Sequence, residues 1–182
     1  MTDNPNTTAM ISDEYREMQR QLHQDPNFGV ASLHYAGLVA QVMNERRYTE
    51  VLDYGAGKGR LGPAVAEHTN HDITVIHYEP AVPEWSARPE PCKFVACIDV
   101  LEHIEPDYLP NVLDDLRRVV LEFGLFTVAT GPAGKILSDG RNAHLIQKPP
   151  RWWLPQFMER FDLFAFTRTP SGFVIAVEPK RE

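Results

Sequence analysis

The sequence has little cysteine, no long apolar run and no excess of positive charge. Two cysteines, Cys92 and Cys97, are too few for a disulfide framework, and without a clustered histidine pattern they do not predict a zinc site, so no metal is expected. The chain begins without a basic and apolar leader, and nowhere approaches the roughly 18 uninterrupted apolar residues of a membrane span. We therefore expect a cytoplasmic protein that does not associate with a membrane.

Positive charge is scarce as well. Against 25 Asp and Glu stand 18 Lys and Arg, for a formal net charge of −7 at pH 7, which argues against a protein that coats nucleic acid electrostatically. A chain of 182 residues holds one domain with a core but leaves no room for a separate recognition domain. We expect no stable binding to duplex DNA, and either a monomer or a homodimer.

Apolar residues alternate between helical and strand spacing along the chain. Short apolar runs predict strands over 51–54, 73–78, 94–98, 125–130, 161–169 and 172–177, and helical spacing predicts helices over 11–22, 30–43, 61–68, 109–120 and 151–160. Alternation followed by a terminal hairpin predicts an α/β fold with a mostly parallel sheet. We expect residues 1–48 to form an N-terminal helical lid or extension, and residues 49–182 to form one compact domain.

The strongest local signal is Asp53-Tyr-Gly55-Ala-Gly57-Lys-Gly59, between a predicted strand and a predicted helix. Glycines in such a turn allow a ligand to approach the backbone, and a helix N-terminus attracts an anionic group. A phosphate-binding P-loop needs Ser or Thr after its lysine, and Gly59 follows Lys58. The dinucleotide pattern needs glycine where Arg60 stands, so a nicotinamide oxidoreductase is a distant alternative.

The segment 53–59 resembles motif I of the class I S-adenosylmethionine-dependent methyltransferases. Later segments follow that family's order: the strand at 73–78 ends in Glu79, and the strand at 94–98 runs into Asp-Val-Leu-Glu-His-Ile at 99–104. The resemblance implies a three-layer Rossmann-like sheet whose strands 6 and 7 form the antiparallel hairpin. The whole chain also resembles short methyltransferase-like proteins of bacteriophages and prophages, a likeness that names no substrate.

The resemblance implies S-adenosylmethionine as the cofactor and assigns its contacts. Asp53 would accept from the ammonium group and Glu79 would bind the ribose hydroxyls. Main-chain amides of the glycine turn and the helix dipole would complement the carboxylate. The remaining expected cofactor contacts are Gly55, Ala56, Gly57, Lys58, Pro80, Cys97, Ile98 and Asp99. For Cys97 a plain buried thiol is an equal alternative.

Methyl transfer is an in-line displacement, so the protein mainly supplies proximity and a desolvated pocket, with a base only if the acceptor must lose a proton. The candidate bases are Asp99, Glu102, His103 and His144. The loop at 131–149 is predicted to roof the substrate, and Arg141, Asn142, His144 and Trp152 are the candidate substrate contacts. The alternatives are a surface loop in which Asn142 caps a turn, and a Trp152 that packs the last helix against the sheet.

The acceptor class follows from missing motifs. No Asn/Asp-Pro-Pro-Tyr/Phe follows the strand at 94–98, as amino-methylating nucleic-acid enzymes require, and Cys97 is not preceded by proline as in carbon-5 cytosine enzymes. We expect a small-molecule or nucleotide-type acceptor. Because no base is assured, a catalytically degenerate cofactor-binding domain that acts as an interaction module remains the alternative.

Proline, in contrast, is abundant, with 15 residues, most of them in clusters that indicate rigid loops. Residues 81–93 contain Pro83, Pro89 and Pro91 and are too few for the helix and third strand that full-size family members carry there. We predict that strand 3 and its helix are missing. The strand at 73–78 would then lie at the sheet edge, with a rigid proline loop walling the adenine pocket.

Overall fold

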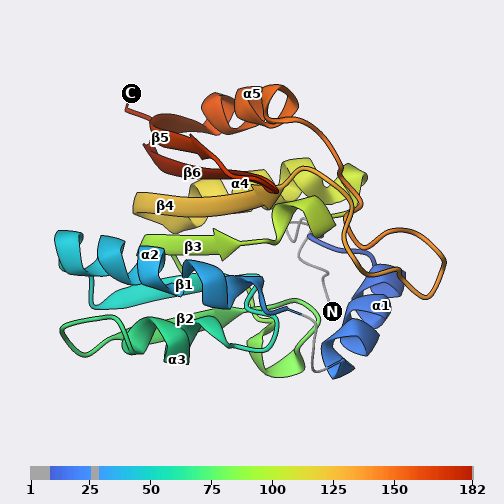
Figure 1. The fold of residues 1–182 in the computed structure, drawn as a ribbon, viewed down its shortest axis with the longest axis horizontal. Coiled ribbons are helices and arrows are strands. Elements are labelled where there is room, and N and C mark those ends of the chain that lie inside the picture. Colours follow the sequence, from blue (N-terminus) through green and yellow to red (C-terminus); the bar gives the residue numbers. More distant parts are fainter. Residues whose placement is uncertain (1–8, 26–28, 182) are drawn as a thin grey trace, which may run out of the picture.

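A computed structural model describes residues 9–25 and 29–181, which form one six-stranded sheet in the order β2-β1-β3-β4-β6-β5 (Figure 1). The strands are β1 (Glu50–Tyr54), β2 (Thr74–Tyr78), β3 (Cys92–Ile98), β4 (Val120–Ala129), β5 (Phe161–Arg168) and β6 (Gly172–Pro179). Strands β2, β1, β3 and β4 are parallel, whereas β6 is antiparallel to both β4 and β5. The predicted α/β sheet with a C-terminal antiparallel hairpin is confirmed.

Helices cover both faces of this sheet. They are α1 (Asp13–Gln24), α2 (Ala31–Arg46), α3 (Leu61–Ala66), α4 (Leu109–Val119) and α5 (Pro150–Arg160), with 3-10 turns η1 (Pro83–Trp85), η2 (Leu101–His103) and η3 (Pro106–Tyr108). Helices α2 and α3 contribute to one hydrophobic core through Val39 and Leu61, and α4 and α5 to another through Leu113 and Trp153. Within the described ranges, no helix is long and apolar enough to cross a membrane.

The side chains of the central strands alternate between these two cores. In β3, Phe94 and Ala96 belong to the core with α2 and α3, while Val95 and Cys97 belong to the core with α4 and α5. Successive side chains of a strand point to opposite faces, so a strand covered on both sides is apolar throughout. This explains the uninterrupted apolar run at 94–98 and confirms the three-layer arrangement.

Strand β4 begins at Val120, earlier than the predicted start at 125. The first residues pair with β3, with Val120 opposite Cys92 and Phe123 opposite Phe94. The sequence pattern missed this stretch because the exposed Glu122, which forms an ion pair with Lys93 at 2.9 Å, interrupts the apolar run. The strand therefore continues directly from the end of α4.

The predicted loss of strand 3 is confirmed: the described residues between β2 and β3 contain only η1, and β2 lies at the sheet edge. The predicted role of the proline loop is wrong. Residues 81–91, all within the described ranges, do not line the cavity described below. Instead the Trp85 ring lies 4.5 Å from the His77 ring, and Arg88 pairs with the buried Asp115 at 2.8 Å.

The parallel strands end beside α1 and the loop between β4 and α5 (Figure 1). Helix α1, which belongs to the expected N-terminal extension, lies at this end of the sheet. Helix α2 packs in the core, where the Met43 side chain is fully buried. The division of the chain at residue 48 stays a prediction.

Candidate functional site

A cavity of about 460 Å³ lies at the carboxyl ends of β1, β2 and β3. It is lined by residues 53–57 and 78–80, by parts of 98–104 and 132–135, by His144 and by one face of α1. From β1 the chain continues to β2, which lies on one side of β1 in the sheet, and then to β3, which lies on the other side. Ligands of open α/β sheets bind where the chain switches sides in this way, so this cavity is the candidate site.

The glycine turn after β1 is shaped for close packing. Gly55 has a φ of 82°, in the left-handed region that favours glycine. A Cβ at this position would lie 2.5 Å from a methyl carbon of Val100. The amides of Gly55 and Ala56 donate to the Tyr78 carbonyl at 2.8 and 3.0 Å. Gly55 and Ala56 therefore line the cavity, but their amides are already used in bonds to Tyr78. We had expected these amides to donate to a ligand.

Asp53 lies at the end of β1 and lines the cavity with its side chain almost fully buried. Its Oδ2 has no hydrogen-bond partner among the described residues, and His77 Nδ1, at 3.5 Å, makes no hydrogen bond to it. Burial raises the pKa of this carboxyl group. A buried carboxylate oxygen without a donor is costly, so Asp53 is suited to receive a cationic group of a ligand.

Glu79, at the end of β2, also lines the cavity. Its carboxylate accepts from the Gly57 amide at 3.1 Å and from the Ala81 amide at 3.0 Å. Burial raises the pKa of Glu79, while these two hydrogen bonds oppose the shift. Glu79 thereby joins the end of β2 to the glycine turn and remains at the cavity wall.

The predicted cofactor contacts do not all reach the cavity. Asp53, Gly55, Ala56, Gly57, Glu79, Pro80, Ile98 and Asp99 line it. Cys97 is fully buried in the core with α4 and α5. Of its two predicted roles, the plain buried thiol therefore fits the structure better than the cofactor contact. The Lys58 ammonium donates to the carbonyl of Asp25 at the end of α1 and does not line the cavity.

Of the candidate bases, Asp99, His103 and His144 meet at the carboxyl end of β3. His103 Nδ1 lies 2.8 Å from the Ala143 carbonyl oxygen, and His144 Nδ1 lies 2.7 Å from that of Gly131. Burial, reinforced by the neighbouring His144, lowers the pKa of His103 to about 4. His103 is therefore neutral at physiological pH and a weak base.

Glu102 lies behind this group and does not line the cavity. Its side chain is 0% exposed and accepts from the Ala129 amide at 2.5 Å. Burial, and next the charge of Asp99, raise the pKa of Glu102 well above its usual range. Its position joins η2 to the end of β4, which favours a structural role over that of a base.

The other predicted substrate contacts lie away from the cavity. Arg141 forms an ion pair with Asp139 at 2.6 Å, and the Asn142 side chain bonds the main chain of Ala133 and His144. Trp152, 38% exposed on α5, packs edge-on against Trp153. In the described chain none of Arg141, Asn142 and Trp152 lines the cavity. This agrees with the alternatives in which Asn142 organises the loop and Trp152 packs.

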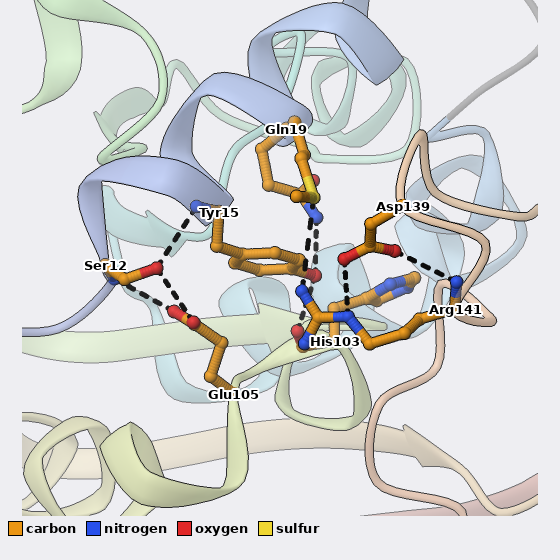
Figure 2. A network of polar contacts seen from close by, with 8 residues as sticks. Ser12, Tyr15, Gln19, His103, Glu105, Asp139 and Arg141 are labelled. Carbon is orange, nitrogen blue, oxygen red and sulfur yellow. Dashed lines mark hydrogen bonds and ion pairs between the residues drawn. The ribbon is translucent and has the colours of Figure 1, made fainter.

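Helix α1 supplies cavity residues that the sequence analysis did not assign. Tyr15, Gln19 and His23 line the cavity, and their spacing of four residues puts them on one helix face. Figure 2 shows Tyr15 between Gln19, whose amide donates to the Tyr15 hydroxyl, and the His103 carbonyl, to which that hydroxyl donates, both at 2.6 Å. The spacing was the available signal, but it was used only to predict a helix.

The N-terminal end of α1 is held by a second contact, also drawn in Figure 2. The amide and hydroxyl of Ser12 both donate to the Glu105 carboxylate, at 2.9 and 2.8 Å. At the other end, Lys135 pairs with Asp25 at 2.7 Å. Helix α1 is thus bound to both segments that frame the β3 side of the cavity.

The sequence matches no protein-family profile and no curated protein, but the structure resembles solved methyltransferases. A 1,6-didemethyltoxoflavin-N1-methyltransferase from Burkholderia thailandensis, solved with 1,6-didemethyltoxoflavin and S-adenosylhomocysteine, has a TM-score of 0.66 at 18% identity, over 99% of this chain and 94% of that one. The DhpI-SAH complex has a TM-score of 0.60 at 16% identity, over 94% of this chain and 100% of that one.

An O-methyltransferase family protein from Burkholderia thailandensis has a TM-score of 0.67 at 10% identity. The match covers 95% of this chain but only 64% of that one, so the chain spans about two thirds of that protein's length. At these identities the likeness concerns the fold. The chain has the Rossmann-like fold of the S-adenosylmethionine-dependent methyltransferases.

Proposed function

We propose that this protein is a cytoplasmic S-adenosylmethionine-dependent methyltransferase that acts on a small-molecule or nucleotide-type acceptor. The fold supports methyl transfer in general, and two similar structures were solved with S-adenosylhomocysteine or SAH. The observation that carries the proposal is Asp53 at the wall of the cavity, where its buried Oδ2 lies 3.5 Å from His77 Nδ1 and accepts no hydrogen bond from the described residues.

The cofactor fits the residues at the ends of β1 and β2. Asp53 would accept from the ammonium group, and the backbone of Gly55, which packs against Val100 too closely for a Cβ, would form the wall beside it. Glu79 would bind the ribose hydroxyls while keeping its bonds to the Gly57 and Ala81 amides. When bound, the cofactor supplies the methyl group on a positively charged sulfur.

The chain's own contribution is positioning and exclusion of water. Helix α1 covers the cavity, and the β3 end presents Asp99, His103 and His144 beside the cofactor residues. Neutral His103 is too weak a base to remove a proton unaided, because its pKa is lowered to about 4. Alignment of acceptor and methyl group in a closed pocket is worth more to such a reaction than a strong base.

Isothermal titration calorimetry with S-adenosylmethionine and S-adenosylhomocysteine tests the cofactor assignment. We expect binding by the wild type and at least about tenfold weaker binding, about 1.4 kcal/mol, by Asp53→Asn and Glu79→Gln. Glu67→Gln is the matched control, because Glu67 is an exposed acid outside the cavity. Absence of binding to both compounds refutes the proposal, and binding of NADH instead would favour an oxidoreductase.

A labelled methyl donor then tests catalysis. Incubation with panels of nucleotides, phenols, acids and amines should yield a labelled product with one class. If the cofactor binds and no class is methylated, the interaction-module alternative is favoured.

A further inference from the structure

Three side chains that can bind a metal ion converge at the β3 end of the cavity. One ligand atom each from Asp99, His103 and His144 lie within 4.8 Å of one another. Asp99 and His103 follow β3 directly, whereas His144 comes from the loop between β4 and α5. All three residues line the cavity.

Both imidazole rings are oriented by the main chain. A carbonyl oxygen only accepts, so the nitrogen that bonds it must carry the proton. Nδ1 of His103 therefore donates to Ala143, and Nδ1 of His144 donates to Gly131. The lone pair of each ring is then on Nε2. Metal-binding histidines commonly have this arrangement, in which one nitrogen donates to a carbonyl and the other binds the ion.

Glu102 provides an independent observation at the same place. Its Oε1 accepts from the Ala129 amide, but its Oε2 is buried without a hydrogen-bond partner among the described residues. A buried polar atom without a partner beside the three ligands is consistent with a group that binds at this end of the cavity.

We propose that Asp99, His103 and His144 bind one divalent transition-metal ion. Two imidazole nitrogens and one carboxylate favour Mn²⁺, Fe²⁺, Co²⁺, Ni²⁺ or Zn²⁺ over Mg²⁺ and Ca²⁺, which prefer oxygen ligands throughout. Three protein ligands leave coordination positions for a further ligand, and these residues line the cavity.

The role of the ion rests on the proposed function. The site lies at the β3 end of the cavity, beside the residues proposed to bind the cofactor, so an ion there would adjoin a bound acceptor. An ion there would hold an acceptor oxygen and lower the pKa of a bound hydroxyl group. The inferred acceptor class is therefore a hydroxyl-bearing molecule.

The test is titration of chelator-treated, full-length protein with Co²⁺, Mn²⁺ and Zn²⁺, followed by calorimetry and, for Co²⁺, by visible absorption. We expect about one ion per chain, with affinity reduced at least about tenfold in Asp99→Asn and His144→Ala. Asn tolerates the left-handed conformation found at Asp99, where φ is 59°, so Asp99→Asn should fold. His68→Ala is the matched control, because His68 is exposed and outside the cavity.

Absence of binding by the wild type, or equal affinity in Asp99→Asn, His144→Ala and the wild type, overturns the proposal. Circular dichroism of each variant shows whether it is folded, and Asp99→Asn alone decides if His144→Ala is not. Titration of the metal-free protein with S-adenosylhomocysteine separates the two proposals. Cofactor binding without metal binding refutes only the metal site, and metal binding without cofactor binding refutes only the proposed function.

Discussion

The two halves of the cavity are built differently. The half proposed to bind the cofactor (the cofactor half), residues 53–57 and 78–80, consists of two short continuous segments at the ends of neighbouring strands. The half proposed to bind the acceptor (the acceptor half) combines residues of α1, of 98–104 and of 132–135 with His144, which are far apart in the sequence. A continuous segment is set by its own backbone, whereas the acceptor half depends on packing between elements. Substitutions in the two halves should therefore have different effects.

The largest effect is expected from Gly55→Ala in the cofactor half. The substitution places a Cβ at a φ of 82° and 2.5 Å from Val100, which should lower the free energy of unfolding by about 1–3 kcal/mol and abolish cofactor binding. Thermal unfolding and calorimetry measure both. Gly37→Ala is the control: Gly37 lies in α2 with no heavy atom near its Cβ position, so this substitution should stabilise by about 0.5–1 kcal/mol. Equal behaviour of the two variants would contradict the prediction.

A pH-dependent effect is expected next, in the acceptor half. Burial, and then the charge of Lys58, lower the pKa of His23 to about 4. The unfolded chain binds a proton near pH 6.5 and the folded chain does not, so this residue's stabilising contribution is present above pH 6.5 and is lost as the pH falls towards 4. As the pH is lowered from 7.5 to 4.5, the Tm of the wild type should therefore fall more than the Tm of His23→Gln. A constant difference between the two Tm values would show that His23 titrates normally.

Tyr15→Phe should have a smaller effect, because it removes only the hydroxyl that joins α1 to the His103 carbonyl. We expect a loss of about 0.5–1.5 kcal/mol in stability. Acceptor binding should weaken while cofactor binding is retained. This result would show that the two halves of the cavity bind their ligands independently. Tyr108→Phe, outside the cavity on η3, is the control. Equal weakening of both ligands would mean that α1 serves the whole cavity.

The smallest effect is expected from Arg141→Ala. The Arg141 side chain pairs with Asp139 at 2.6 Å in the loop and does not line the cavity, so stability should change by no more than about 0.5 kcal/mol. Acceptor binding should be unchanged. A clear loss of acceptor binding would instead support Arg141 as the substrate contact that the sequence predicted.

The same division explains what the sequence could predict. The cofactor half was predictable because Asp53, the glycines and Glu79 each directly follow a strand, and the ends of adjacent parallel strands meet. The missing strand was predictable from the short proline-containing segment at 81–93. These inferences need only local geometry and chain length.

The acceptor half was not predictable in the same way. Asp99 and His103 belong to one recognisable segment, but nothing in the sequence shows that His144 meets them or that Arg141 and Trp152 do not. Their positions depend on how Asn142 folds its loop against Ala133 and on how α1 packs against that loop through Tyr15, Met18, Leu137 and Ala143.

Helix α1 is fastened to the cavity by side-chain contacts and belongs to no part of the sheet's hydrogen bonding. Its polar links include the Ser12–Glu105 pair, the Tyr15 hydroxyl and the Lys135–Asp25 ion pair, and Tyr15 and Met18 pack against Leu137 and Ala143. Because none of these contacts is part of the sheet, we expect α1 to open locally while the sheet stays folded. Amide hydrogen exchange should then be faster in α1 than in β3, and each opening of α1 would expose the cavity that this helix lines.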